Sequence, residues 1–113
     1  MVISRTQRGF TLIELLIVIS MMANETVLKD DLFTLRRTID EFTYDRKRAP
    51  QSLDELVQTG YLKQIPKDPI TNAPNWDPTM ETDVLSEGVE IGIADIHSHS
   101  DLLSTQGTAY SSW

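Results

Sequence analysis

Residues 9–23 read GFTLIELLIVISMMA, an apolar run with one ionisable side chain, Glu14, near its start. An ionised carboxylate in hydrocarbon costs about 2.5 kcal/mol or more, so such a residue is rarely there without a partner. A short polar leader, MVISRTQRG, precedes the apolar run; it carries Arg5 and Arg8 and ends in Gly9. A chain that keeps Glu14 in an apolar helix therefore needs a partner for this carboxylate.

The order of basic leader, small residue, Phe and apolar run resembles the class III signal of type IV pilins and type II secretion pseudopilins. The residues that fit the family pattern are Gly9, Phe10, Thr11, Leu12, Ile13, Glu14, Leu15 and Leu16. In that family a prepilin peptidase cuts after the glycine and methylates the new N-terminal Phe. The resemblance implies a leader peptide at residues 1–9, with Gly9 and Phe10 on either side of the processed bond.

An ordinary secretory signal is the alternative interpretation of a basic segment followed by an apolar one. The position of Gly9 argues against it, because cleavage there leaves the apolar run on the mature chain. Glu14 argues against it as well, since a carboxylate has no use in the apolar part of an ordinary signal.

Glu14 and the new N-terminus of Phe10 are the predicted assembly residues. Cleavage after Gly9 frees the α-amino group of Phe10, and Glu14 of one subunit can neutralise this cation on its neighbour. In a low-dielectric core each charge is tolerable only with the other nearby. The family resemblance implies the same pairing. Such a contact is heterologous and does not close, so it predicts a helical filament.

The composition allows one small domain beside the N-terminal segment. The chain has 113 residues, a formal net charge of -7 and no cysteine. An acidic surface repels phosphate backbones, which argues against nucleic acid as a partner. Type IV pilins proper commonly close their C-terminal loop with a disulfide, so the lack of cysteine favours the pseudopilin branch.

The apolar run is short for a membrane span. Residues 10–23 amount to 14 residues, or about 21 Å of helix, whereas a span needs about 20 residues. Compared with the family, a block is missing between Met22 and Ala23. We therefore expect a leader at 1–9, a shortened hydrophobic helix at 10–23 and a pilin-like globular domain at 24–113.

Helical periodicity continues from Asn24 to about Arg48. One face carries apolar residues at spacings of four and three: Leu28, Leu32, Leu35, Ile39 and Phe42. This pattern predicts an amphipathic helix with a buried stripe, and Pro50 predicts its end near Arg48.

A short second helix is predicted after Ser52. Ser52 and Glu55 form a capping box, in which each side chain accepts from the other residue's amide, and Gly60 suits the C-terminal cap. Four prolines between Ile65 and Pro78 indicate irregular structure. The pattern over Ala49–Pro69 resembles the major pseudopilin of type II secretion, where it links the helix to the sheet.

The C-terminal third has strand character. Val89, Ile91 and Ile93 alternate with Glu90 and Gly92, as in a half-buried strand that continues through Ile96. Residues 80–85 and 76–79 are weaker candidates, and Pro78 indicates an edge. An antiparallel sheet of two to four strands would then pack on the apolar stripe. The fold class is α+β: a long N-terminal helix, a short second helix and a small antiparallel C-terminal sheet.

The loop after this strand has the chemistry of a possible ion site. Major pseudopilins bind calcium in a C-terminal loop, and Ser98, Ser100 and Asp101 resemble the first part of that loop. Calcium takes six to eight oxygens, usually with more than one carboxylate. The second acidic cluster of the family is absent, so calcium has low support and no other cofactor is expected.

Other side chains in this region have simpler interpretations. His97 and His99 would share a face of a strand and present two imidazoles to a metal, yet two surface histidines are the simpler interpretation. His97, Ser98 and Asp101 are too close in sequence for a hydrolytic triad, so no enzyme activity is expected. Tyr110 and Trp113 are expected to fold back on the domain or to contact a neighbouring subunit.

The chain is therefore interpreted as a structural subunit of a pilus-like filament, most similar to the major pseudopilin of type II secretion. The resemblance implies a single-pass inner-membrane location with a periplasmic domain. Expected partners are further copies of the chain, the prepilin peptidase, the inner-membrane assembly platform, minor pseudopilins and the membrane. Two alternatives stay open: a type IV pilus or DNA-uptake pilin, and a membrane-anchored periplasmic domain that binds a ligand through residues 95–113.

Overall fold

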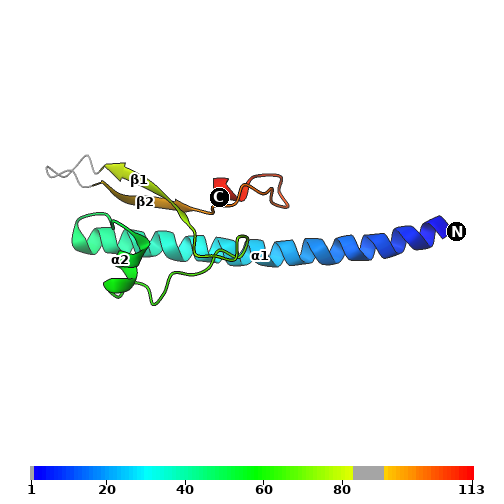
Figure 1. Cartoon of the computed structure of the whole chain (residues 1–113), viewed down its shortest axis with the longest axis horizontal. Helices are drawn as coiled ribbons and strands as arrows, with labels where there is room; N and C mark the ends of the chain where they lie inside the picture. The colour runs from blue at the N-terminus through cyan, green and yellow to red at the C-terminus, as the bar shows by residue number, and fades with distance from the viewer. Residues whose placement is uncertain (1, 83–90) are drawn as a thin grey trace.

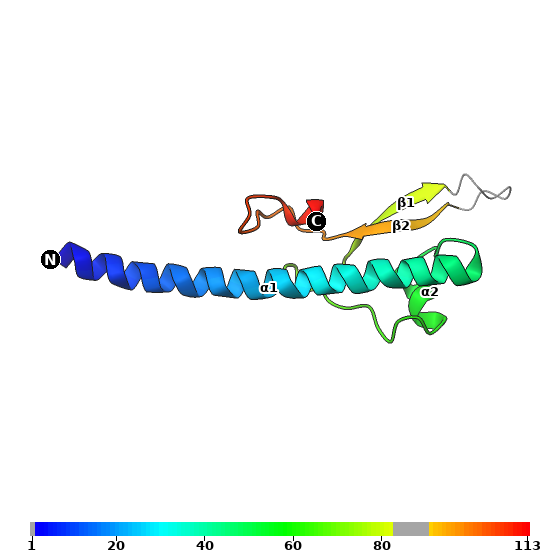
Figure 2. The same ribbon diagram turned by 180° about the vertical axis from the view of Figure 1, so that it is seen from behind.

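A long helix carries a small sheet and a loop on its C-terminal half (Figure 1). The structure, a computed structural model, describes the backbone of residues 2–82 and 91–113 and the side chains of 11–81 and 91–113. The elements are α1 (Val2–Arg46), α2 (Leu53–Gln58), β1 (Asp77–Thr82), β2 (Ile91–His97) and the 3-10 helix η1 (Tyr110–Ser112). The molecule measures 73 × 26 × 18 Å. Its length comes from α1, whose N-terminal half extends beyond the rest of the chain in both views (Figures 1 and 2).

Helix α1 runs without interruption through 45 residues. It joins the two helical stretches expected on either side of Asn24. The helix ends two residues before the predicted end, because Lys47 has a left-handed backbone with φ of 57°. The Lys47 amide still donates to the carbonyl of Thr43 at 2.9 Å, which closes the last turn.

Helix α2 has the predicted caps, with one difference in its capping box. Ser52 accepts from the Glu55 amide at 3.2 Å. The Glu55 carboxylate, however, accepts from the amide of Gln51 at 3.1 Å, and not from that of Ser52 as predicted. Its other partner is Arg48, at 2.8 Å, which lowers the pKa of Glu55. A cation on the preceding segment therefore holds the carboxylate away from the predicted position.

Gly60 ends α2 as expected. It has φ of 87°, its amide donates to Val57, and the next amide, that of Tyr61, donates to Leu56 at 2.9 Å. These two bonds form a Schellman motif, which needs a residue with positive φ.

Strands β1 and β2 form a two-stranded antiparallel sheet. Pro78 pairs with Ile96, and a proline is tolerated because a strand of so small a sheet keeps an open edge. The register shifts between Thr79 and Met80, which leaves Ala94 without a partner. A bulge of this kind rotates the strand locally, so Ile93 and Ile96 are both buried although they are three residues apart.

The predicted alternation of β2 is wrong at two positions. Ile91 is 54% exposed, whereas Gly92 is buried. The segment before α2 crosses here: Ile93 donates to the carbonyl of Pro50 at 2.8 Å, and a Cβ on Gly92 would lie 2.4 Å from that of Ala49. Gly92 is thus buried by a close backbone contact. Val89 and residues 83–85, part of the weaker strand candidate, lie outside the described residues.

The core lies between the sheet and the predicted stripe of α1. The five predicted stripe residues, Leu28, Leu32, Leu35, Ile39 and Phe42, are at most 2% exposed. The side chains packed with them are Leu56, Trp76, Ile93, Ile96 and Tyr110. The stripe is therefore confirmed as a core face, and the arrangement matches an α+β pilin fold.

Candidate functional site

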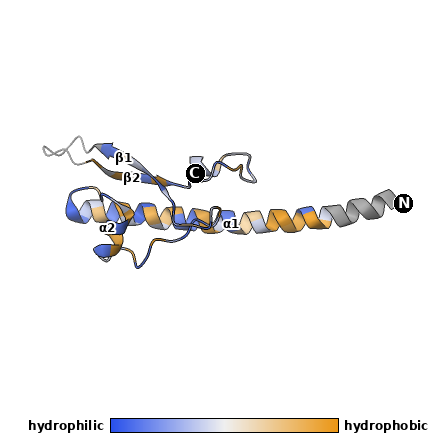
Figure 3. Cartoon of the chain, viewed as in Figure 1, coloured by the Kyte–Doolittle hydropathy of each residue, from blue (hydrophilic) through white to orange (hydrophobic). Residues whose placement is uncertain are grey.

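The N-terminal half of α1 is an exposed apolar helix. Its large apolar side chains are 42–65% exposed: Leu12, Ile13, Leu15, Leu16, Ile17, Val18, Ile19 and Met22. Figure 3 shows this apolar stretch beyond the sheet and loops. The helix from Thr11 is long and apolar enough to cross a membrane, with a mean hydropathy of 1.7 over its most apolar window. It fits a single-pass membrane anchor.

Glu14 is exposed on this apolar helix, one turn after Phe10. Among the described side chains, none forms a hydrogen bond or ion pair with its carboxylate. The backbones of Gly9 and Phe10 lie in α1, and their side chains are outside the described set. A partner for Glu14 in hydrocarbon must therefore come from another molecule or from residues outside the described side chains.

Sequence reasoning missed Glu25, a buried carboxylate that fastens the C-terminal loop to α1. Glu25 is only 5% exposed. One carboxylate oxygen accepts from the Thr105 amide at 2.7 Å and from the Tyr110 hydroxyl at 2.8 Å. The other oxygen accepts from the Thr105 hydroxyl at 2.7 Å. The sequence spacing could have identified it, because Glu25 precedes Leu28 by three residues and therefore lies on the buried face of the helix.

The charge of Glu25 is stabilised where it lies. Burial alone would raise its pKa, but the bonds from Thr105 and Tyr110, together with the charge of Lys29, outweigh burial, so the pKa is lowered. The same contact acts in the opposite direction on Tyr110: burial and the neighbouring carboxylate raise the pKa of its phenol to about 12. The pair is thus a buried phenol donating to a buried carboxylate.

Arg36 forms a second attachment between α1 and the C-terminal residues. Its guanidinium donates to Asp95 at 2.8 Å, to the carbonyl of Ile96 at 3.0 Å and to the main-chain oxygen of Trp113. Trp113 packs edge-on against Tyr110, with ring centroids 5.2 Å apart. The Lys29 ammonium lies 4.9 Å from the centre of the Trp113 ring. Both aromatic residues therefore fold back on the helix, the first of the two expected positions.

The N-terminal residues match a known family model. The match is to the prokaryotic N-terminal methylation motif and covers residues 4–23. The chain carries the signature of type IV pilin-like proteins. This pilin-like motif includes Gly9, Phe10 and Glu14, and it implies processing by a prepilin peptidase and assembly into a pilin-like filament. No curated protein and no solved structure matches the chain.

The three predicted calcium ligands make separate local bonds. Ser98 is fully buried, donates to Asp68 and accepts from the Ser100 amide at 3.2 Å. Ser100 accepts from the amide of Leu102 at 3.2 Å, and Asp101 accepts from the Ser111 hydroxyl at 2.7 Å. No cluster of three metal-ligating side chains occurs within the described residues. The three residues thus have hydrogen-bond partners within the domain, and calcium binding stays a prediction.

The two described histidines lie near different carboxylates. His97 lies 3.5 Å from Asp95, and the exposed His99 lies 2.9 Å from Asp77. The hydroxyl of Ser98 points to Asp68 and not to either imidazole. The structure therefore does not bring the two histidines to one ligand, nor His97, Ser98 and Asp101 to one another.

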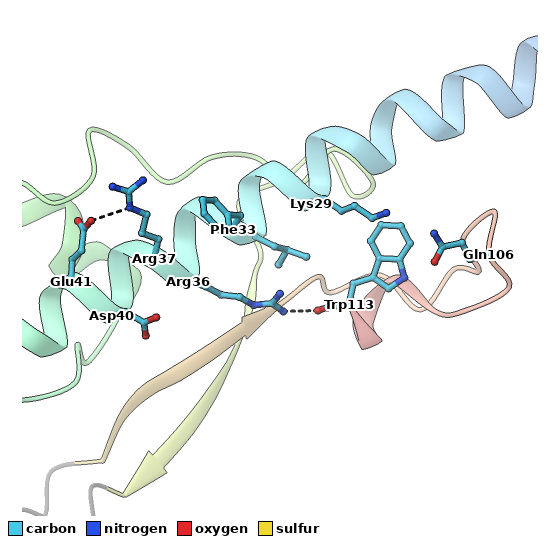
Figure 4. Close-up of a pocket in the computed structure, with 9 residues that line it drawn as sticks. Lys29, Phe33, Arg36, Arg37, Asp40, Glu41, Gln106 and Trp113 are labelled. Atoms are coloured by element: carbon cyan, nitrogen blue, oxygen red, sulfur yellow. Dashed lines mark hydrogen bonds and ion pairs between the residues drawn. The ribbon is translucent and has the colours of Figure 1, made fainter.

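An open groove of about 630 Å³ runs beside the C-terminal half of α1 (Figure 4). Phe33 is 65% exposed at this groove, and Figure 4 shows Lys29 over the ring of Trp113. The remaining lining residues are Leu32, Arg36, Arg37, Asp40, Glu41 and Gln106. The groove is thus an exposed face with apolar and charged side chains, which suits contact with another protein surface.

Proposed function

We propose that the chain is the structural subunit of a type II secretion pseudopilus. The observation that carries this proposal is the methylation motif at residues 4–23, placed on an exposed apolar helix that contains the single carboxylate Glu14. Insertion of a single copy of this helix into a membrane costs free energy, because the Glu14 carboxylate has no partner among the described side chains. A neighbouring subunit with a free α-amino group at Phe10 supplies the partner.

Two features support the secretion branch over a surface pilus. The chain has no cysteine; its C-terminal loop is held by a hydrogen bond from the Thr105 amide to Glu25 and by one from Arg36 to the main-chain oxygen of Trp113. The segment 49–69 also has the arrangement that resembles major pseudopilins: a capped short helix, then Tyr61 and Leu62, then Pro66 to Pro69.

The proposed assembly starts in the inner membrane. The prepilin peptidase removes residues 1–9 and methylates Phe10, while the acidic domain lies in the periplasm. The assembly platform and minor pseudopilins then receive subunits whose Glu14 pairs with the N-terminus of the neighbour. Because the same two groups repeat along the axis, each added subunit takes the same register.

Glu14→Ala tests this proposal. The change removes the intersubunit partner and leaves the soluble fold intact, so the variant should be inserted and processed but should give no filaments by electron microscopy. Asp30→Ala, which removes an exposed carboxylate farther along α1, is the matched control and should assemble normally. Normal filament yield from Glu14→Ala would contradict the pairing.

The host phenotype separates the alternatives. Deletion of the gene should abolish protein secretion and leave twitching and DNA uptake unchanged. Loss of twitching or uptake instead would assign the chain to a type IV pilus. A wild-type chain that never forms filaments in the presence of its peptidase and platform would indicate an anchored binding domain.

A further inference from the structure

Two adjacent leucines protrude from the C-terminal loop beside the apolar part of α1. Leu102 is 66% exposed and Leu103 is 65% exposed. Single exposed leucines are ordinary on protein surfaces, but these two line a groove of about 290 Å³ with Met21, the last turn of the apolar run. The other lining residues are Asn24, Pro69, Ile70 and Tyr110. The leucines therefore continue the apolar surface of the membrane anchor.

The backbone around the leucines is held on both sides. Leu102 donates to the Ser100 hydroxyl at 3.2 Å and accepts from the Tyr110 amide at 3.0 Å. Leu103 pairs with Ala109, and two residues later Thr105 is fastened to Glu25. The leucines thus project from a loop that is fixed to α1, close to where the apolar run ends.

The apolar run at the start of α1 is shorter than the hydrocarbon core of a bilayer, although the helix as a whole is long enough to cross it. Residues 10–23 span 14 positions, or about 21 Å of helix, against a hydrocarbon core of about 30 Å. If α1 starts at one face of the core, its polar domain is drawn toward the other face. The residues beside Met21 are thereby drawn close to the acyl chains and headgroups of that face.

We propose that Leu102 and Leu103 insert into the surface of the bilayer that holds α1. The occupant of this apolar surface is lipid, because the surface is continuous with the anchor and lies at the depth where the anchor ends. Two carboxylates of the region already have hydrogen-bond partners: Asp101 accepts from the Ser111 hydroxyl, and the buried carboxylate of Glu25 accepts from Thr105. Docked in this way, the loop extends a short anchor and fixes the depth of the domain. The proposal rests on the membrane anchor and does not depend on filament formation.

Site-specific labelling of the full chain in vesicles tests the insertion. The chain has no cysteine, so Leu103→Cys provides a single site for an environment-sensitive fluorophore. The vesicles contain phosphatidylethanolamine and phosphatidylglycerol, without any assembly protein. We expect blue-shifted emission that is quenched by lipids carrying a nitroxide near the headgroup.

Two further labels make the result decisive. Ile17→Cys, within the apolar run, reports that α1 is inserted. Tyr44→Cys, which is 74% exposed near the C-terminal end of α1, reports a site in water. If the label at position 103 shows the emission and quenching of the label at position 44, while position 17 is protected, the proposal is overturned. The membrane anchor itself is then still supported by position 17. Protection of position 103 only at high protein density overturns it too, because a second copy then covers the leucines.

A double variant measures the contribution of the leucines to membrane attachment. Leu102→Ser with Leu103→Ser should leave the melting temperature unchanged, since both side chains are exposed. It should raise the fraction released by alkaline carbonate by about tenfold, as expected when two leucines lose contact with lipid. The control Ile91→Ser removes a side chain that is 54% exposed on the sheet and should release no more than wild type. Equal release of the double variant and the control would contradict the insertion.

Discussion

At the scale of single residues, Glu25 is a buried carboxylate that connects α1 to the C-terminal loop. It joins parts of the chain that are 80 residues apart in sequence, through Thr105. A buried carboxylate with three hydrogen-bond donors keeps its charge, whereas the same donors without the carboxylate are left buried and unpaired. Glu25 therefore couples the folding of the loop to that of α1.

Glu25→Gln should lower the free energy of unfolding by about 1–3 kcal/mol, because the amide nitrogen cannot accept from Thr105 or Tyr110 as the carboxylate does. Urea unfolding of the full chain in detergent measures the change. The control Asp30→Asn, at an exposed position on the same helix, should change it by less than about 0.5 kcal/mol. Equal effects at the two positions would show that the loop is not fastened at Glu25.

The two shifted groups of this contact predict opposite pH limits. The pKa of Glu25 is lowered from 4.5, so its contribution is present above pH 4.5 and is lost as pH falls through the lowered value. The pKa of Tyr110 is raised from 10.0 to about 12, so its contribution is present below pH 10 and is lost as pH rises toward 12.

Tyr110→Phe checks the alkaline limit. The difference in phenolate absorbance between wild type and this variant should titrate near pH 12. The variant should also lose the extra destabilisation above pH 10, the unshifted pKa. A difference spectrum that titrates near pH 10 would mean that Tyr110 is open to solvent.

At the scale of elements, the stripe of α1 supports the sheet. Leu35 lies in the middle of this stripe and is fully buried. Leu35→Ala should cost about 2–5 kcal/mol, since it leaves a cavity between helix and sheet. Phe33→Ala, at a 65% exposed position on the same helix, should cost far less. A loss well under 1 kcal/mol at Leu35, measured by urea unfolding, would place the stripe outside the core.

The C-terminal loop predicts no response to calcium. Its hydroxyls are already used, as in the bond from Ser98 to Asp68, and an ion that binds only the native state would raise the melting temperature. We expect identical melting of the full chain in millimolar calcium and in chelator, and little effect of Asp101→Ala on the apo fold. A calcium-dependent rise that Asp101→Ala abolishes would establish the family's ion site.

Local patterns were predictable from sequence, and contacts between distant segments were not. The apolar stripe and the caps at Ser52 and Gly60 depend on neighbours within a few residues, so periodicity and turn chemistry identify them. The bond from Thr105 to Glu25 and that from Ser98 to Asp68 join segments 80 and 30 residues apart. The exposure of Ile91 likewise depends on how the segment before α2 crosses β2, which no local pattern contains.

At the scale of the whole molecule, the apolar anchor and the folded domain occupy opposite ends of α1. The N-terminal half of α1 is an apolar helix with one carboxylate, and the C-terminal half carries the sheet and the fastened loop (Figure 1). This division suits a subunit that is held in a membrane and then packed against its copies, with the acidic domain outward. It requires a free N-terminus at Phe10, since that cation is the proposed partner of Glu14.

Mass spectrometry of the chain extracted from membranes, with the prepilin peptidase present, tests this requirement most directly. The predicted product begins at Phe10, lacks residues 1–9 and carries one methyl group on its N-terminus. Replacement of Gly9 by a bulky residue should leave the leader attached, because the peptidase needs a small side chain at the cut. A wild-type chain that still begins at Met1 would contradict the account.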